Sequence, residues 1–275
     1  MNATPATIAQ AQKILQDNPW WYHSIELAPG IVTPGLAPVD YWKSIFQTLQ
    51  LPDLRGKSVL DIGAWDGAFS FFAEQRGAAR VVAMDDFVWF IDMQAYTRES
   101  RIAQEKGLHI QLAHESPHWR PSELPGKRPF DALHEFFASK VESVVGSFLK
   151  LDPAEVGQFD VVLFLGVLYH MEDPLGAMRR AASFVRPGGL LAIESAAMDL
   201  PGAPDSAYME FYPTDEFNGD PTNWFSPNAR AIEGLTIASG LRDFRLLQGP
   251  PARPAVITEP MRVRYRAIAS ARKPA

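Results

Sequence analysis

The 275-residue sequence contains no cysteine, which excludes disulfide bonds, thiolate metal sites and cysteine nucleophiles. It has no apolar run of about 18 residues, the shortest stretch that spans a membrane as a helix. Its first residues lack the basic start and the apolar segment of a signal peptide. From these absences we expect a soluble, cytoplasmic protein with no membrane partner.

Positive charge is also scarce. The chain has 26 lysines and arginines against 32 aspartates and glutamates, a formal net charge of −6. Proteins that coat nucleic acid usually carry excess positive charge, so we expect no nucleic-acid partner, although a local basic patch is compatible with a negative total. The hydrophobic content of 47% is typical of a globular protein.

The first part of the chain predicts a helical and irregular cover. Residues 4–16 have apolar side chains at helical spacing, and residues 20–38 are rich in aromatics, proline and glycine. Residues 39–51 predict an amphipathic helix with Tyr41, Ile45 and Leu49 on one side. We therefore divide the chain into a cover, residues 1–55, and a main domain, residues 56–275.

The main domain alternates short apolar runs with helical stretches. Runs without polar alternation, each followed by a helix, indicate an α/β fold with a doubly wound, mostly parallel sheet. The last two runs, residues 240–247 and 263–272, have no helix between them and predict an antiparallel hairpin at one edge of the sheet. Residues 113–129 are too rich in proline for a helix. Residues 197–228 form an insertion too long for an ordinary connection, and we expect it to cover the substrate.

A glycine loop follows the first apolar run, in the stretch DIGAWDG. Gly63 would let a ligand approach the backbone, and Gly67 would allow close packing and leave free N–H groups where the next helix begins. Asp85 ends the next run, about twenty residues after Gly63, where an acid can accept both ribose hydroxyls. The pattern is D-x-G-x-x-x-G, with Trp65 where a dinucleotide fingerprint would have glycine. A nucleoside ligand without a pyrophosphate fits this pattern, while the structural alternative is a tight turn with a surface acid.

This motif resembles the first motif of class I S-adenosylmethionine methyltransferases. Residues 159–197 resemble the fourth strand, the following helix and the fifth strand of that family, including the stretch RPGGLLAIES. The resemblance implies a Rossmann-like sheet of seven strands and S-adenosylmethionine as cofactor. The residues expected at the cofactor are Asp61, Gly63, Ala64, Trp65, Gly67, Asp85, Ser147, Phe148, Leu165 and Gly166.

Further stretches look like the branch that contains the tRNA wobble-uridine carboxymethyltransferase and related small-molecule methyltransferases. They include WYHSIELAPGIVTPG near the start and GVLYH after the fourth strand. The tRNA enzyme uses a lysine to hold the extra carboxylate of its modified cofactor, and residues 26–40 contain no lysine or arginine. The long N-terminal extension of that enzyme is also missing.

Both departures favour plain S-adenosylmethionine and a small-molecule acceptor, for instance in specialised metabolism. One alternative is a tRNA-modifying methyltransferase of the wobble-uridine type. Another is a protein that binds S-adenosylmethionine without catalysis.

Catalytic groups must lie at the carboxyl end of the fourth strand or in the cover above it. Tyr169 and His170 follow that strand directly, and a histidine titrates near neutrality. His170 is therefore our candidate base, with a role as pocket wall or loop brace as the alternative. The residues expected around the acceptor are Trp21, Tyr22, His23, Tyr208, Glu210 and Trp224. For Trp21, Tyr22 and His23, the alternative is a hydrophobic clamp that holds the N-terminal helix. For the three insertion residues, the alternative is a loop that packs its own side chains.

Two further groups have less specific patterns. His170, Glu172, Asp173 and Glu194 are suitable metal ligands by type, but we expect no functional metal. Arg262, Arg264 and Arg266 alternate along the final strand and share one face, which we expect to be solvated. The alternative is that they contact an anionic acceptor. Finally, we expect residues 20–36 and 197–228 to meet above the carboxyl end of the sheet.

Overall fold

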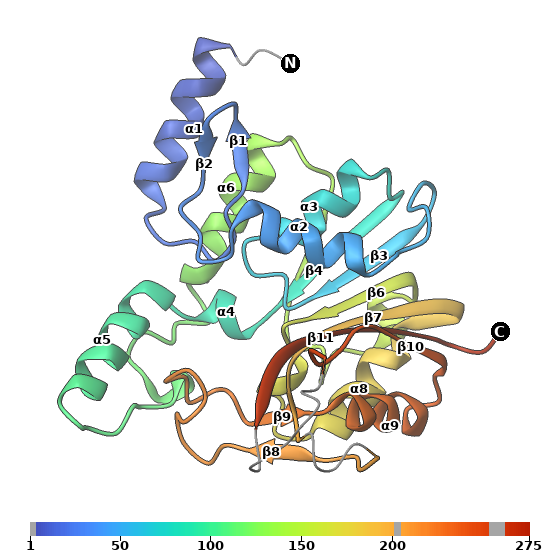
Figure 1. The fold of residues 1–275 in the computed structure, drawn as a ribbon. Coiled ribbons are helices and arrows are strands. Elements are labelled where there is room, and N and C mark those ends of the chain that lie inside the picture. Colours follow the sequence, from blue (N-terminus) through green and yellow to red (C-terminus); the bar gives the residue numbers. More distant parts are fainter. Residues whose placement is uncertain (1–3, 201–204, 253–261) are drawn as a thin grey trace.

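A seven-stranded sheet forms the centre of the computed structural model, which describes residues 4–200, 205–252 and 262–275 (Figure 1). The strand order is β10-β11-β7-β6-β3-β4-β5. The five strands from β7 to β5 are parallel, whereas β11 runs antiparallel to both β7 and β10. The predicted doubly wound sheet with an antiparallel hairpin at its edge is therefore confirmed. The bounds are β3 (Ser58–Ile62), β4 (Arg80–Asp85), β5 (Glu142–Val145), β6 (Phe159–Leu165), β7 (Val185–Asp199), β10 (Arg242–Gln248) and β11 (Val263–Arg272).

Helices cover both faces of this sheet, which is why β3 and β6 are apolar without alternation. One face packs against α1 (Pro5–Asp17), α2 (Val39–Thr48), α3 (Ala68–Gln75) and α6 (Arg128–Phe136). The other packs against α7 (Pro153–Val156), α8 (Pro174–Ser183) and α9 (Ala229–Ala238). The short α4 (Phe87–Phe90) and the longer α5 (Met93–Glu105) follow β4. Single 3-10 turns span Ala113–Glu115, Pro125–Lys127 and Leu168–His170, so the proline-rich segment is mostly irregular, as predicted.

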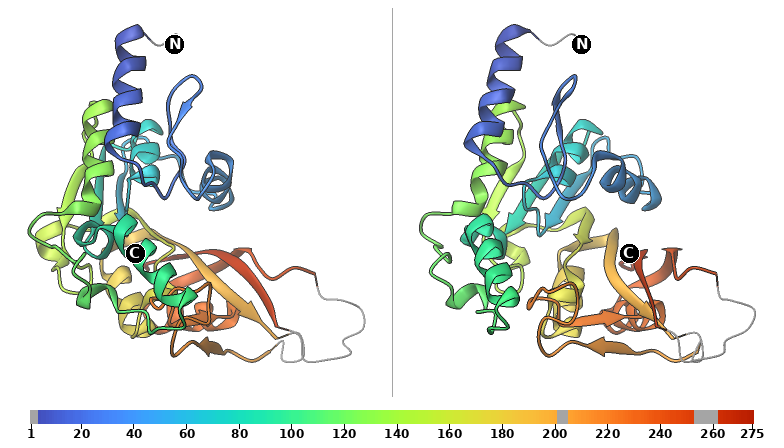
Figure 2. Two further views of the ribbon diagram at one scale, coloured as in Figure 1. Left: turned by 90° about the vertical axis from the view of Figure 1, so that its left-hand side faces the viewer. Right: turned by 60° about the vertical axis from the view of Figure 1, so that its left-hand side comes forward.

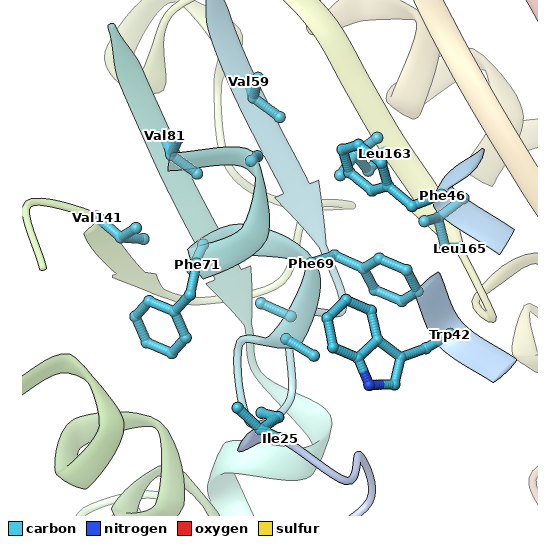
Figure 3. Close-up of a cluster of buried hydrophobic side chains, with 14 of the residues drawn as sticks. Ile25, Trp42, Phe46, Val59, Phe69, Phe71, Val81, Val141, Leu163 and Leu165 are labelled. Carbon is cyan, nitrogen blue, oxygen red and sulfur yellow. The ribbon is translucent and has the colours of Figure 1, made fainter. Parts of the chain in front are cut away.

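The N-terminal cover shares one hydrophobic cluster with the sheet (Figure 3). It consists of α1, a small hairpin of β1 (Glu26–Ala28) and β2 (Ile31–Val32), and α2. Trp42 and Phe46 of α2 point toward Phe69 and the end of β6. The prediction that Tyr41, Ile45 and Leu49 form the apolar side of α2 was partly wrong. The buried positions are Trp42, Ile45, Phe46 and Leu49, at a spacing of three and four residues, and Tyr41 is 44% exposed.

The insertion contains a second small sheet, β8 (Met209–Phe211) paired with β9 (Phe225–Pro227). Residues 201–204 of the insertion lie outside the described residues. The N–H of Trp224 donates to the carbonyl of Tyr169 over 2.9 Å, which fixes the insertion to the loop after β6. Gln104 of α5 reaches Asp215, and Figure 2 shows α5 beside this part of the insertion. Among the described residues, no helix is both long and apolar enough to cross a membrane.

Candidate functional site

The strand order reverses between β3 and β6, and in open α/β sheets such a point marks the ligand crevice. Gly63 follows β3 with φ +78°, and Gly166 follows β6 with φ +73°. A Cβ atom on Gly63 would lie 2.8 Å from Cγ2 of Val167, so the two loops approach closely here. The backbone of Gly63 is exposed. Glycine at position 63 thus serves both the turn and an open approach to the backbone.

Asp85 ends β4 beside this loop and is buried. One carboxylate oxygen accepts the N–H of Trp65 over 3.0 Å, and the other accepts the N–H of Val88 over 3.1 Å. Burial raises the pKa of Asp85 to about 7. A carboxylate has about four lone-pair positions, so two hydroxyl donors can still be accepted.

Asp61 and Asp66 add two more buried acids to the same loop. The hydroxyl of Ser70 donates to Asp61 over 2.6 Å, and burial raises the pKa of Asp61 to about 6. The two acids of the glycine stretch, together with Asp85 beside it, would repel a pyrophosphate, whereas they suit hydroxyl donors and a positively charged group. The loop therefore fits an adenosyl sulfonium cofactor better than a dinucleotide.

Gly67 begins α3 with φ +83°. The expectation of close packing is met, because a Cβ atom there would lie 2.6 Å from Phe71 and 2.7 Å from Phe130. The free N–H groups expected where α3 begins do not include that of Gly67 itself. The Gly67 N–H donates to the carbonyl of Ala64 over 2.7 Å and closes the turn. Trp65 adopts φ +52° and stacks on Tyr22, with ring centroids 4.2 Å apart.

The remaining predicted cofactor residues follow neighbouring strands. Gly146, just before Ser147, donates its N–H to the carbonyl of Asp85 over 3.0 Å. Phe148 is buried against Phe164, with ring centroids 5.5 Å apart. The full predicted set thus lies at or just beyond the carboxyl ends of β3, β4, β5 and β6, and its contacts with cofactor remain predictions.

Asp66 attaches the cover directly to the glycine loop. Its carboxylate accepts the N–H groups of Tyr22 and His23 over 3.1 and 2.8 Å, and it contacts Nδ1 of His23 at 2.5 Å. The His23 ring is buried with its edge against Phe69. Sequence reasoning missed this acid, although a second acid in DIGAWDG was a visible signal.

Trp21 belongs to the hydrophobic core. It is 2% exposed, and its indole N–H donates to the carbonyl of Asn18. The structure thus places Trp21 in the hydrophobic cluster beside α1 and His23 against the glycine loop, and their role toward an acceptor stays a prediction. Only Tyr22 of this segment turns toward the charged groups described next.

Glu194 of β7, which is buried, and Arg266 of β11, whose side chain is 31% exposed, form an ion pair beside the β6 loop. The second contact of this pair, from Nη2 to Oε2, measures 2.5 Å. The guanidinium carbon lies 5.0 Å from the centre of the Tyr169 ring. Burial raises the pKa of Tyr22, and the neighbouring Tyr169 and Glu194 raise it further. These side chains form a compact polar group on the sheet face that the cover occupies, which we call the Tyr22–Arg266 cluster.

Arg262, just before β11, and Arg264 are exposed, in line with the expected solvated face, but both also have partners within the protein. Arg264 lies over the rings of Phe217 and Tyr212, at 4.9 and 5.8 Å. Arg262 contacts Glu210 over 2.7 Å. β8 and the loop after it supply both the acid and the rings.

The insertion residues expected at the acceptor also have partners within the protein. The Tyr208 hydroxyl donates to Asp199 over 2.9 Å. Glu210 accepts the hydroxyl of Tyr212 over 2.7 Å. Trp224 joins the insertion to Tyr169 through its backbone. Their role toward an acceptor stays a prediction.

His170 lies in the loop after β6, with Nδ1 3.0 Å from the carbonyl of Thr222 in the insertion. Burial lowers the pKa of His170, so the ring is neutral at pH 7. Asp173 and Glu194, two of the four residues that are suitable metal ligands by type, already have other partners. Asp173 caps α8 by accepting the N–H of Gly176, and Glu194 holds Arg266.

Comparison with known proteins places this site in a family. The family model described as a methyltransferase domain matches residues 39–243. A tRNA U34 carboxymethyltransferase from Dichelobacter nodosus is 27% identical over 199 residues, 70% of this chain and 49% of that protein. The same enzyme from Azotobacter vinelandii is 24% identical over 225 residues, 82% of this chain and 57% of that protein. The chain thus spans about half the length of the curated relatives it matches.

Solved structures confirm the fold. The N-terminal domain of EvdMO1, crystallised with S-adenosylhomocysteine (SAH) and D-fucose, has a TM-score of 0.58 at 14% identity. That match covers 98% of this chain and 97% of the other. An O-methyltransferase family protein from Burkholderia thailandensis has a TM-score of 0.51 at 14% identity, covering 85% of this chain and 56% of the other. With the family model matching most of its length, the chain belongs to the methyltransferase-domain family and is a class I S-adenosylmethionine-dependent methyltransferase.

Proposed function

We propose that the chain transfers a methyl group from S-adenosylmethionine to a small polar acceptor held at the Tyr22–Arg266 cluster. The observation that supports this most is the ion pair of Glu194 and Arg266, in which the buried Glu194 lies opposite Leu165 at the carboxyl end of β6. When bound, the cofactor supplies an electrophilic methyl group on a sulfonium, whose sulfur leaves as a neutral thioether. The protein has to orient the acceptor in line and exclude water.

The cofactor would be held by the loop described above. Asp85 would accept the ribose hydroxyls, and Gly63 would let the cofactor approach the backbone. Asp61 lies where a positively charged amino group would be stabilised. Ser147 and Phe148 would border the adenine, since their loop is bonded to Asp85 through Gly146.

The acceptor would lie between the cover and the insertion. Tyr22 supplies a hydroxyl from the cover, and Tyr169 supplies one from the β6 loop. Arg266 contacts Glu194 through Nε and Nη2 and also interacts with the Tyr169 hydroxyl, so it would add a cationic group beside the two hydroxyls. The hydroxyls of Tyr22 and Tyr169 and the guanidinium of Arg266 would be the polar groups of the site, and the tyrosine rings its apolar wall. Such a lining is typical of small-molecule sites.

The competing function is tRNA modification, which the names of the curated relatives favour. Two features weigh against it. Arg262 and Arg266 are paired with Glu210 and Glu194, which reduces the positive charge that this strand offers to phosphates. The extra carboxylate of a carboxylated cofactor would also compete with Glu194 for Arg266. A fold relative crystallised with a sugar is consistent with a small acceptor.

Binding of bulk tRNA separates the two functions. The protein, saturated with SAH, is titrated into labelled tRNA at low and moderate salt. We expect no saturable complex in the low micromolar range. A complex whose affinity falls steeply with salt would overturn the small-molecule proposal and favour tRNA.

A further inference from the structure

The insertion carries a polar chain that ends on His170. Thr222 Oγ1 lies 2.6 Å from a carboxylate oxygen of Asp220 and 3.0 Å from Nδ1 of His170. A carboxylate only accepts, so the Thr222 hydroxyl must donate its hydrogen to Asp220. The lone pairs of that hydroxyl therefore face His170.

This arrangement determines where the proton of the imidazole lies. Nδ1 of His170 meets two acceptors, the hydroxyl oxygen and the carbonyl oxygen of Thr222, each at 3.0 Å. Only a protonated Nδ1 satisfies both contacts, so the neutral ring carries its hydrogen on Nδ1. The lone pair that can take a proton is then on Nε2.

The sequence of the insertion makes the chain rigid. The carboxylate of Asp220 also accepts the N–H of Thr222 over 2.9 Å, across Pro221, which closes a tight turn. The side-chain amide of Asn223 donates to the carbonyl of Phe217 over 2.8 Å and anchors the next residue. Trp224 then bonds to Tyr169, directly before His170. The turn is therefore fixed within the insertion, and Trp224 connects it to the loop that carries His170.

Burial disfavours the charged form of His170, and the carbonyl of Thr222, the carboxylate of Asp220 and the guanidinium of Arg266 act on it as well. Asp220 favours the charged imidazolium, while Arg266 disfavours it. The Tyr169 ring lies 4.2 Å from the imidazole, centre to centre. Asp220 is thus the acid that would compensate a positive charge appearing on the ring.

We infer that Asp220 and Thr222 are positioning residues that hold His170 as the Nδ1–H tautomer, with Nε2 as the base for the acceptor. This inference rests on the proposed function. Nε2 takes the proton of an acceptor O–H or N–H, and the electron pair of that bond stays on the atom that receives the methyl group. The proton then passes from Nε2 to water. Asp220, through the Thr222 hydroxyl, stabilises the imidazolium formed in between.

Nitrogen NMR of the protein labelled with 15N-histidine tests the tautomer without any acceptor. In the wild type at pH 7.5 we expect a protonated Nδ1 and a bare Nε2 at His170. An Nε2–H tautomer would overturn the inference, whichever reaction the protein catalyses.

Substitutions test the role of the carboxylate. Asp220→Asn should lower the pKa of His170, lower kcat about tenfold, move the acidic limb of the pH profile to lower pH, and leave the KM for S-adenosylmethionine within twofold. The matched control is Asp215→Asn in the same insertion, whose carboxylate contacts Gln104. It should leave the His170 pKa and kcat unchanged.

Substitutions at Thr222 distinguish a positioning role from a general effect on folding. Thr222→Ser keeps the hydroxyl and should behave like the wild type, whereas Thr222→Val should reproduce the Asp220→Asn effects. Equal pKa values of His170 in the wild type and Asp220→Asn would contradict the inference. If the acceptor proves to be tRNA, the proposed function fails, but the tautomer and pKa measurements still decide the positioning role.

Discussion

The backbone N–H of Trp65 donates to the carboxylate of Asp85 across 3.0 Å. This bond joins the glycine loop after β3 to the end of β4, twenty residues further along the chain. Because Trp65 also stacks on Tyr22, the same loop connects to the cover. The cofactor loop, the ribose acid and the cover are thus mechanically linked.

Asp85→Ala should weaken SAH binding by about 1.5–3 kcal/mol, the range for hydrogen bonds to a charged group. That corresponds to roughly a tenfold to hundredfold rise in Kd in a calorimetric titration. Asp86→Ala is the control, since the structure gives its side chain no bond to the loop comparable with those of Asp85. A larger loss for Asp86→Ala would place the ribose one residue away from our assignment.

Cofactor affinity should rise with pH toward about 7. The pKa of Asp85 is raised to about 7 in the free protein, and ribose hydroxyls are accepted best by the ionised form. Binding should therefore release protons below pH 7. Calorimetry at pH 6.5 in two buffers of different ionisation enthalpy measures this release, and a binding enthalpy independent of buffer would argue against it.

The free energy of unfolding should change with pH in the opposite direction to the cofactor affinity. Asp85 and Asp61 have folded pKa values of about 7 and about 6, above the unfolded value of about 3.9. The folded state thus binds more protons, and the free energy of unfolding should fall as pH rises from about 4 to 7. Asp85→Asn should flatten this slope in urea titrations. An unchanged slope would show that Asp85 ionises normally.

Gly63→Ala should cost more stability than Gly30→Ala, although both glycines have φ +78°. The backbone penalty for alanine, about 1–2 kcal/mol, is common to both. At Gly30 a Cβ atom meets nothing within 4 Å, whereas at Gly63 it lies 2.8 Å from Val167. Urea unfolding compares the two, and only Gly63→Ala should also weaken SAH binding. Equal losses would mean that Val167 moves aside freely.

Asp66→Asn should loosen the cover. The carboxylate accepts two backbone N–H groups and contacts the His23 ring, and an amide replaces it poorly. Hydrogen exchange at the amides of Tyr22 and His23 should speed up about tenfold or more, with exchange in β6 unchanged. Unaltered exchange at both amides would show that packing alone holds the segment.

The sheet and the glycine loop were predictable because their signals are local. Apolar runs without alternation predict buried parallel strands, and the spacing from Gly63 to Asp85 predicts a strand end beside the loop. Resemblance in two separate stretches then narrowed the ligand to S-adenosylmethionine. The position of Asp85 between two backbone donors could not be read from the sequence, but its place at the strand end could.

The charged and polar pairs of the site were not predictable, because their partners lie far apart in the chain. Asp66 and His23 are 43 residues apart, and Glu194 and Arg266 are 72 apart. From the local sequence alone, Asp66 is interpreted as a loop acid, His23 as part of an aromatic cluster, and Arg266 as part of a solvated strand face.

Transfer of a labelled methyl group tests the central claim most directly. The protein is incubated with S-adenosylmethionine carrying tritium on the methyl group, together with either a small-molecule cell extract or bulk tRNA, and each fraction is counted. We predict label in the small-molecule fraction, about a hundredfold less of it with His170→Ala, the effect expected on removing a general base, and none in tRNA. Label in tRNA alone, dependent on His170, would contradict the account.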